Sequence, residues 1–291
     1  MRLYLVLLLL SCCSLAQAVE RAFFREDGSK IEYYLMSENK TKTLLVVLQG
    51  SDCNSVYNNQ FVRENFTQLV EADVLLVEKY AITNELPYRL DEARSDCPVD
   101  YLLNDSVLQR RDDYLHVLAY LKSHYEKIYL LGGSEGAVVA ALIAHKADYI
   151  DKAVLINGGS RFFLDDILHN LAATVPTEHL AAAQADFIAK VKGLASANSG
   201  SLSGHGAKWW RDAMAVDLQH SLEQSQVRLL YIQTTKDENV DWQGALAMSQ
   251  ALTNKNVKFV FIDHQNHFFL DQNGASLVKV VKEMIVDWLA D

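Results

Sequence analysis

The sequence lacks the features that mark several large classes of protein. Three prolines and thirteen glycines in 291 residues exclude collagen-like and low-complexity chains. With 37 acidic against 27 basic side chains, the chain has no domain-wide basic surface to hold a nucleic acid. It has no His-Glu-x-x-His or Cys-x-x-Cys metal pattern and no Gly-x-x-x-x-Gly-Lys phosphate loop. We therefore expect no metal, no cofactor and no nucleic-acid partner.

The amino terminus has the pattern of an export signal. Arg2 is followed by an unbroken apolar run, Leu3–Leu10, and then by the small-x-small pattern of Ala16–Ala18. The run is too short to span a bilayer, so we expect no transmembrane segment in the mature chain. The pattern predicts a cleaved signal peptide over residues 1–18 and a periplasmic or secreted protein. The alternative is a lipoprotein signal ending at Cys12.

Two of the four cysteines lie inside this signal, which leaves Cys53 and Cys97. Two cysteines in an exported chain are often paired, and we expect this pair to form a disulfide. The alternative is two free, partly buried thiols.

The rest of the chain, residues 19–291, alternates strand and helix patterns and is predicted to be one domain. The strand-like runs are continuous and apolar, as in strands buried on both faces: 43–48, 74–79, 128–131, 152–157, 227–234 and 257–263. A hairpin is expected at 21–36, and helices at 56–70, 105–125, 242–252 and 270–289. These patterns predict an α/β fold with about eight mostly parallel strands and helices on both faces.

Two stretches depart from the alternation. Residues 80–104 have no clear period and form a long excursion, of the kind that often borders a binding site. Residues 162–226 have helical patterns at 163–171, 177–194 and 208–222 around a Ser/Gly-rich segment. We interpret this second stretch as a helical cap inserted over the sheet.

One motif carries chemistry. The apolar run at 128–131 leads into Gly132-x-Ser134-x-Gly136 and then into a run of small, helix-forming residues. A serine between glycines on a strand-to-helix turn is the nucleophile elbow, in which the turn strains the serine backbone and exposes its hydroxyl. The alternative is a glycine-rich turn without chemistry.

A serine nucleophile needs a base and an acid, and both residue types follow later strands. Asp237 comes soonest after the strand at 227–234, with Glu238 and Asp241 as alternates. His267 follows the strand at 257–263, with His264 as the alternate. Parallel strands place their carboxyl ends at one edge of the sheet, so we predict a Ser-Asp-His triad there.

The negative charge that develops during acyl transfer needs backbone N–H donors. We expect one from Glu135, which follows the serine, and one from Ser51, since Gly50 lets the chain turn closely after an earlier strand. Asp52 is a difficulty, because a carboxylate beside this position opposes the charge unless it points away.

The segments LLVVLQGSD, YLLGGSEGA, IQTTKDENV and DHQNHFF, in that order, resemble the α/β-hydrolase superfamily over nearly the whole mature chain. The resemblance implies that fold, a Ser-Asp-His triad and a cap domain at about 162–226. Where the family usually has His-Gly, this chain has Gln49-Gly50, which keeps the backbone role and removes a side chain. Gly-Gly-Ser-x-Gly-Ala and the run Gly204–Trp210 are most similar to prolyl-oligopeptidase-like and dienelactone-hydrolase-like members. The resemblance to true oligopeptidases covers only their catalytic half.

The leading hypothesis is a carboxylesterase that forms an acyl-enzyme on Ser134. A peptidase or amidase with the same triad is an alternative, and so is a hydrolase-like binding protein without turnover. In the first two cases the partner is a small-molecule ester or a peptide substrate. Trp209, Trp210, Phe162 and Phe163 are expected either to line an acyl pocket under the cap or to serve ordinary helix packing.

Overall fold

The structure is a computed structural model that describes residues 19–36, 41–90 and 94–291. The predicted signal peptide at residues 1–18 and the alternative lipoprotein site at Cys12 lie outside these ranges. Among the described residues, no helix has both the length and the apolar character needed to cross a bilayer.

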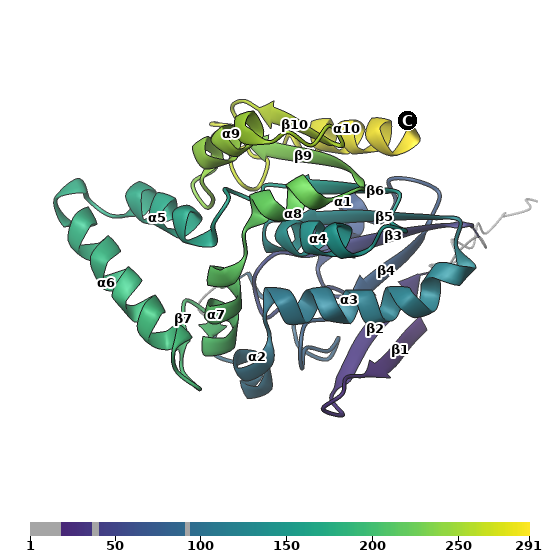
Figure 1. The fold of residues 1–291 in the computed structure, drawn as a ribbon, viewed down its shortest axis with the longest axis horizontal. Coiled ribbons are helices and arrows are strands. Elements are labelled where there is room, and N and C mark those ends of the chain that lie inside the picture. Colours follow the sequence, from purple (N-terminus) through teal and green to yellow (C-terminus); the bar gives the residue numbers. More distant parts are fainter. Residues whose placement is uncertain (1–18, 37–40, 91–93) are drawn as a thin grey trace, which may run out of the picture.

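The fold is organised around an eight-stranded sheet with the order β1-β2-β4-β3-β5-β6-β9-β10 (Figure 1). The six strands from β4 to β10 in this order pair in parallel, while β1 and β2 form an antiparallel hairpin joined to β4. The strands are β1 (Val19–Phe24), β2 (Lys30–Met36), β3 (Thr43–Leu48), β4 (Asp73–Val77), β5 (Lys127–Gly133), β6 (Lys152–Ile156), β9 (Arg228–Thr234) and β10 (Val257–Ile262). The predicted mostly parallel sheet of about eight strands is confirmed.

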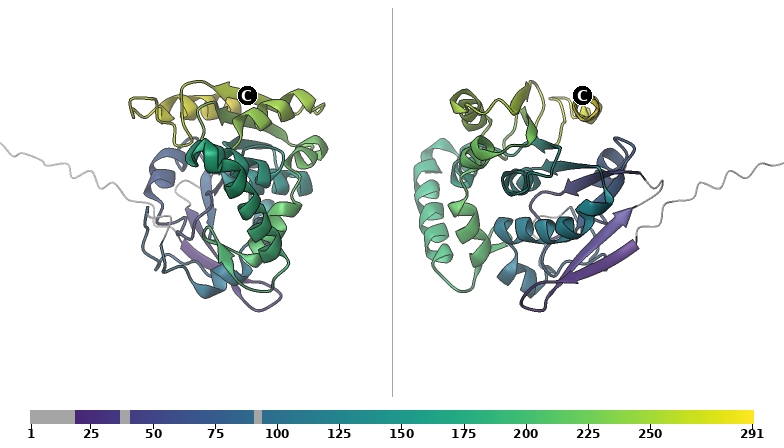
Figure 2. Two further views of the ribbon diagram at one scale, coloured as in Figure 1. Left: turned by 90° about the vertical axis from the view of Figure 1, so that its left-hand side faces the viewer. Right: turned by 45° about the vertical axis from the view of Figure 1, so that its right-hand side comes forward.

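Helices cover both faces of the sheet (Figures 1 and 2). One apolar core joins the sheet to α3 (Val107–Leu121), α4 (Glu135–Lys146) and α8 (Leu218–Gln224). A second core on the opposite face contains α1 (Gln60–Phe66) and α10 (Val278–Ala290). The central strands are buried on both faces, which explains their unbroken apolar sequences.

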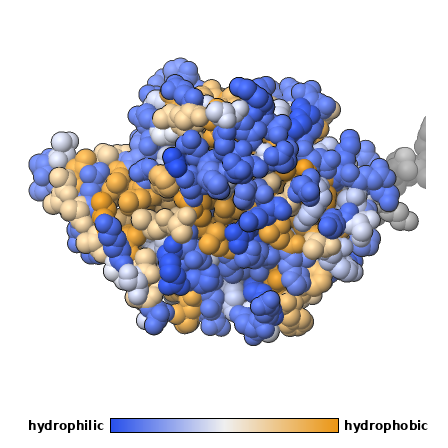
Figure 3. All heavy atoms as spheres, in the orientation of Figure 1, coloured by the Kyte–Doolittle hydropathy of each residue, from blue (hydrophilic) through white to orange (hydrophobic). Residues whose placement is uncertain are grey.

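The stretch at 162–226 forms helices that project from the sheet, at the left of Figure 1. It contains α5 (Phe163–Thr174), α6 (Thr177–Ala195), β7 (Ser201–Leu202), β8 (His205–Gly206) and α7 (Ala207–Ala215) before α8. Apolar side chains gather over this region in Figure 3, and the rings of Phe163 and Phe187 contact Trp210 at centroid distances of 6.1 and 5.7 Å. The insertion is therefore held together by its own aromatic contacts.

Three predicted helices begin or break elsewhere because side chains bind the backbone. The helix expected from residue 270 begins at Val278, since Asp271 Oδ1 accepts the N–H groups of Asn273 and Ala275, at 2.8 Å each, and holds a turn. The helix expected over 208–222 is broken before α8, which Asp217 caps by accepting the N–H of His220.

The helix expected over 56–70 is also shorter and begins at Gln60. The buried carboxylate of Glu78 accepts the N–H groups of Val56 and Tyr57, at 2.9 and 3.4 Å, and keeps the chain in a loop. Asn59 then caps α1. One short helix was not predicted, α2 (Val99–Asn104) inside the excursion. The helix expected over 105–125 is α3, which ends at Leu121 and continues as the 3₁₀ turn η1 (Lys122–His124).

Candidate active site

Ser134 lies at the turn between β5 and α4 with φ 55° and ψ −127°, a conformation that side-chain-bearing residues rarely adopt. Its N–H donates to the carbonyl of Ile156 on the neighbouring strand β6, at 2.8 Å. The strained backbone is therefore held by the sheet itself, as the nucleophile elbow requires.

The two glycines of the motif are needed because backbones pass at contact distance. A Cβ atom at Gly132 would lie 2.1 Å from the carbonyl oxygen of Gly136. A Cβ atom at Gly136 would lie 2.2 Å from the carbonyl oxygen of Leu48, at the end of β3. The turn thus packs against the segment that supplies the second candidate N–H donor.

The carboxylate of Asp237 meets the imidazole of His267. Its Oδ2 lies 2.7 Å from Nδ1 of His267, while Oδ1 accepts the N–H groups of Asn239 and Val240 at 2.9 and 3.1 Å. Asp237 is 2% exposed. A buried carboxylate fixed at one oxygen can hold the imidazole with Nε2 directed away, in the tautomer a general base needs.

The alternate residues lie elsewhere. Glu238 and His264 are exposed, and Asp241 caps α9 (Trp242–Ala251) by accepting the N–H of Gly244 at 3.0 Å. The structure therefore brings Asp237 and His267 together and separates the other candidates from this pair.

The segments expected to supply N–H donors flank Ser134. Glu135 occupies the first position of α4, where a helix leaves its N–H groups without intrahelical partners. On the other side, a Cβ at Gly50 would lie 3.1 Å from Cβ of Ser134 and 3.6 Å from its Oγ. Ser51 follows Gly50 and lines the cavity beside the serine.

The carboxylate of Asp52 is held by other groups. Its Oδ1 lies 3.3 Å from the buried ammonium of Lys79, and its two oxygens accept the N–H and the side-chain amide of Asn54 at 3.0 Å each. Burial raises the pKa of this carboxyl, but the Lys79 charge and the Asn54 hydrogen bonds outweigh it and hold the pKa below its usual range. The paired ammonium offsets the charge of Asp52.

A cavity of about 470 Å³ opens beside Ser134 and His267. Its wall is largely apolar and comes from α1, the ends of β3, β5 and β6, the excursion and the loop after His267: Val47, Leu48, Phe61, Val62, Phe66, Leu90, Leu131, Ile156, Phe268 and Phe269. Volume and lining are those of a small-molecule site.

The insertion contributes none of the described residues that line this cavity. Trp209 and Trp210 are 1% and 0% exposed, and the ring of Phe163 contacts both. The expectation that these side chains line an acyl pocket is therefore wrong. The packing interpretation holds for Phe163, Trp209 and Trp210, whereas Phe162 is exposed. The helix that contributes to the apolar wall is α1, on the other face of the sheet.

Comparisons of the sequence with protein-family models and with curated proteins find no match. The structure, in contrast, is similar to Est1E from Butyrivibrio proteoclasticus, with a TM-score of 0.57 and 15% identity over 94% of this chain and 97% of that one. It is also similar to the Pyrococcus furiosus esterase Pf2001, with a TM-score of 0.62 and 14% identity over 94% and 91% of the two chains. A third similar structure is alpha/beta hydrolase domain-containing protein 10 from mouse, with a TM-score of 0.61 and 15% identity over 94% of this chain and 99% of that one.

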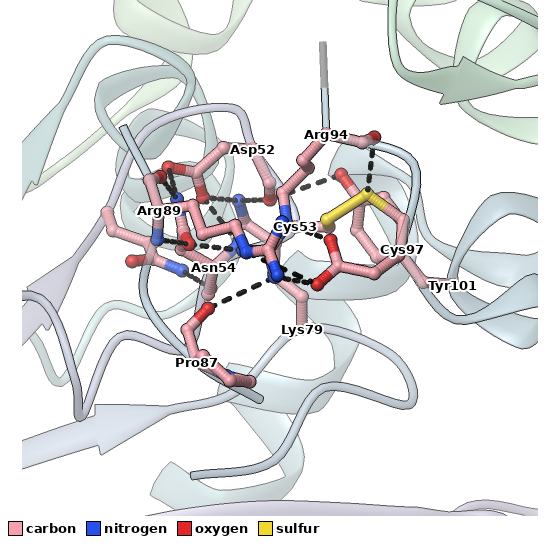
Figure 4. Close-up of a disulfide and its surroundings, with 11 residues drawn as sticks. Asp52, Cys53, Asn54, Lys79, Pro87, Arg89, Arg94, Cys97 and Tyr101 are labelled. Carbon is pink, nitrogen blue, oxygen red and sulfur yellow. Dashed lines mark hydrogen bonds and ion pairs between the residues drawn. A yellow bond between two sulfur atoms is a disulfide. The ribbon is translucent and has the colours of Figure 1, made fainter. Parts of the chain in front are cut away.

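The chain has the α/β-hydrolase fold. In this hydrolase fold, the excursion after β4 lies against the segment 49–54 (Figure 4). The predicted disulfide between Cys53 and Cys97 is present, with an S–S distance of 2.01 Å. Asn54 adds hydrogen bonds to the excursion, because its amide donates to the carbonyl of Arg89 at 2.8 Å and its Oδ1 accepts from the buried guanidinium of Arg94. The cavity wall at residues 88–90 is therefore attached to the segment beside Ser134.

Sequence reasoning missed the partners of the Glu135 side chain. Its buried carboxylate binds Arg110 of α3 and accepts a hydrogen bond from the indole of Trp209. Arg110 stands beside Arg111 in a charged helix segment, and nothing in the sequence distinguishes the buried arginine from its partly exposed neighbour.

In the described part of the chain, no group of three His, Cys, Asp or Glu side chains is arranged to hold a metal ion.

Proposed function

We propose that the protein is an exported serine hydrolase, a carboxylesterase that forms an acyl-enzyme on Ser134. One observation carries the proposal: the His267 imidazole, held by Asp237 at 2.7 Å, lines the same cavity as the strained serine of the elbow. This is the set of groups that acyl transfer to a serine requires.

In the proposed reaction, Oγ of Ser134 attacks the ester carbonyl and Nε2 of His267 accepts the hydroxyl proton. Asp237 stabilises the imidazolium and keeps it in orientation. The carbonyl oxygen becomes an oxyanion that accepts hydrogen bonds from the N–H groups of Glu135 and Ser51. His267 then protonates the departing alcohol oxygen, and the acyl group stays on the serine.

Deacylation repeats these roles with water as the nucleophile. His267 takes a proton from the water, which attacks the acyl carbonyl, and it returns the proton to Oγ of Ser134. The products are a carboxylic acid, an alcohol and the free enzyme.

The apolar cavity wall supports an ester with an apolar acyl group, because burying such a group there removes apolar surface from water. One of the proteins to which the fold is similar, Pf2001 from Pyrococcus furiosus, is named an esterase, which agrees with this choice. The signal pattern at residues 1–18 and the Cys53–Cys97 disulfide support export, since disulfides persist in oxidising compartments.

The test is labelling with a fluorophosphonate probe, for the wild type and for Ser134→Ala. We expect the wild type to be labelled and the variant to be unlabelled. Folded wild type that is not labelled, or equal labelling of both, would contradict the proposal and favour a binding protein without turnover. Hydrolysis of p-nitrophenyl esters beside aminoacyl-anilides then separates an esterase from a peptidase.

A further inference from the structure

The carboxylate of Glu135 is buried although it belongs to the residue next to the candidate nucleophile. It is 4% exposed and lies where α4 meets α3 and α7. An acidic side chain in the first turn of a helix usually faces water, where its charge interacts favourably with the helix dipole and no desolvation is needed. A buried carboxylate must be paired and hydrogen-bonded to be tolerated.

Arg110 pairs with the Glu135 carboxylate and also binds the backbone of the loop after β3. Its guanidinium binds Oε1 of Glu135 through one nitrogen, and a second nitrogen donates to the carbonyl of Gln49 at 2.9 Å. The side chain of Arg110 is 2% exposed. One rigid guanidinium thus contacts both segments from which the oxyanion N–H donors are expected, the start of α4 and the loop after β3.

The contact to Gln49 bears on the direction of the backbone. In a trans peptide the C=O and N–H groups point to opposite sides. Because Arg110 binds the carbonyl of Gln49, the N–H of Gly50 in the same peptide is directed away from the guanidinium. The Gln49–Gly50 peptide is followed directly by the peptide that carries the N–H of Ser51. The orientation of the first peptide therefore constrains the direction of the Ser51 N–H.

Trp209 holds the second carboxylate oxygen. Its indole N–H donates to Oε2 of Glu135 at 2.9 Å, and its ring stacks on His205 at a centroid distance of 3.8 Å and an interplanar angle of 17°. The indole comes from α7 in the insertion. The helical insertion therefore reaches the active site through a hydrogen bond to Glu135, although it does not line the cavity.

The charges of this cluster are compatible with an oxyanion nearby. Burial would raise the pKa of the Glu135 carboxyl, but the charges of Arg110 and Lys79 outweigh it and hold that pKa below its usual range. Glu135 is then a paired anion, and the guanidinium of Arg110 offsets its negative charge.

We propose that Arg110 and Trp209 are positioning residues for the oxyanion hole: by fixing the Glu135 carboxylate and the Gln49 carbonyl, they align the two backbone segments that stabilise the transition state. The inference rests on the proposed hydrolase function. It predicts that weakening either contact slows the chemical step and leaves ground-state binding of the ester intact.

The test compares two variants with two neighbours that serve as controls. Arg110→Lys keeps the charge but loses the forked geometry, and Trp209→Phe keeps an aromatic ring but loses the N–H donor. The controls are Arg111→Lys in the same helix and Trp210→Phe. The latter loses the hydrogen bond from Trp210 to the carbonyl of Leu202, which lies outside the cluster. All four are measured with p-nitrophenyl butyrate, and an alkylboronic acid serves as a tetrahedral transition-state analogue.

We expect Arg110→Lys to lower kcat about 10- to 100-fold with KM changed less than about threefold, and to weaken boronic acid inhibition in parallel. Trp209→Phe should lower kcat about 3- to 10-fold in the same pattern, and it carries the test if Arg110→Lys does not fold. Both controls should keep the wild-type kcat and inhibition constant.

Folded Arg110→Lys or Trp209→Phe enzyme with wild-type kcat would overturn the inference. The inference would also be overturned if Trp210→Phe lowered kcat as much as these variants do while boronic acid inhibition stayed unchanged. That result would show a structural role only. A wild type that hydrolyses no ester and takes no fluorophosphonate overturns the proposed function and this inference together. An active wild type with unaffected variants overturns this inference alone.

Discussion

The side-chain amide of Asn157, the residue after β6, donates to the backbone carbonyl of His267 at 3.0 Å. The same side chain accepts the N–H of Thr234, the last residue of β9, at 2.9 Å. Asn157 therefore joins the loop that carries the candidate base to the strand that precedes the candidate acid. The separation between Asp237 and His267 is set by the sheet as well as by their own hydrogen bond.

This arrangement predicts the effect of removing the acid. Asp237→Asn should lower kcat about 10³- to 10⁴-fold, because an amide at this position favours the wrong imidazole tautomer. The measurement is hydrolysis of p-nitrophenyl butyrate. Glu238→Gln, an exposed neighbour, should keep the wild-type rate. A larger loss in Glu238→Gln than in Asp237→Asn would exchange the roles of the two residues.

The origin of the cavity wall predicts which phenylalanine matters for long substrates. Phe268 lines the cavity and is 56% exposed, while Phe162 in the insertion is 40% exposed and does not line it. Phe268→Ala should raise KM for a p-nitrophenyl decanoate about 3- to 10-fold, since it removes roughly 1 kcal/mol of apolar contact. KM for the acetate should stay the same, and Phe162→Ala should change neither value. An equal effect at both positions would place the chain-binding wall elsewhere.

The disulfide predicts a stability difference. Cys53 and Cys97 are separated by 44 residues, and opening a loop of this size should lower the free energy of unfolding by about 3 to 4 kcal/mol on the chain-entropy account. Urea denaturation of Cys53→Ser/Cys97→Ser against the wild type measures this. A reductant should destabilise the wild type and leave the double variant unchanged. If the reductant has no effect on the wild type, the bridge contributes nothing to stability.

Asp105, the residue after α2, predicts how stability changes with pH. Burial, with the nearby charge of Glu135, raises the pKa of this carboxyl to about 7, against an ordinary value of 3.8. Its Oδ2 has no hydrogen-bond partner in the described part of the chain. Between these two values the folded state keeps a proton that the unfolded chain has released, so the stability contributed by Asp105 falls as pH rises from about 4 to 7.

Asp105→Asn should remove that slope. The expected gain in the free energy of unfolding is a few kcal/mol at pH 8 and close to zero at pH 4, where the carboxyl is protonated in both states. Urea denaturation across pH 4 to 8.5 measures it. Asp100→Asn, at an exposed position of α2, should keep the wild-type slope. A slope that persists in Asp105→Asn would assign the pH dependence to other groups.

The positions of the chemical groups could be predicted because they depend on strand order. Ser134, Asp237 and His267 each follow a strand with a recognisable apolar pattern, and parallel strands bring their carboxyl ends to one edge. The two glycines beside the serine could also be predicted, because the elbow leaves no room for a Cβ at either position.

The wall of the cavity and the support of Glu135 could not be predicted. Val62 and Phe66 of α1 follow the same apolar period whether they face the core or a cavity, and in the structure they do both. Arg110 acts through tertiary contacts with residues 25 and 61 positions away along the chain, and no local pattern records such contacts. The late start of α10 depends on the turn at Asp271, where a side chain competes with the helix for backbone N–H groups.

The position of α1 means that the cavity wall and the helical insertion are encoded by different parts of the gene. Residues that line the cavity come largely from the first third of the sequence, between β3 and residue 90. The insertion contacts the site from outside the cavity, through Trp209 at the Glu135 carboxylate and through His169 of α5 at the backbone carbonyl of Asp237. Selection for a new substrate would then accumulate changes in α1 and the excursion. Because α5 binds the backbone of Asp237, α6, which makes no hydrogen bond to Ser134, Asp237 or His267 among the described residues, is the helix of the insertion best suited to exchange and redesign.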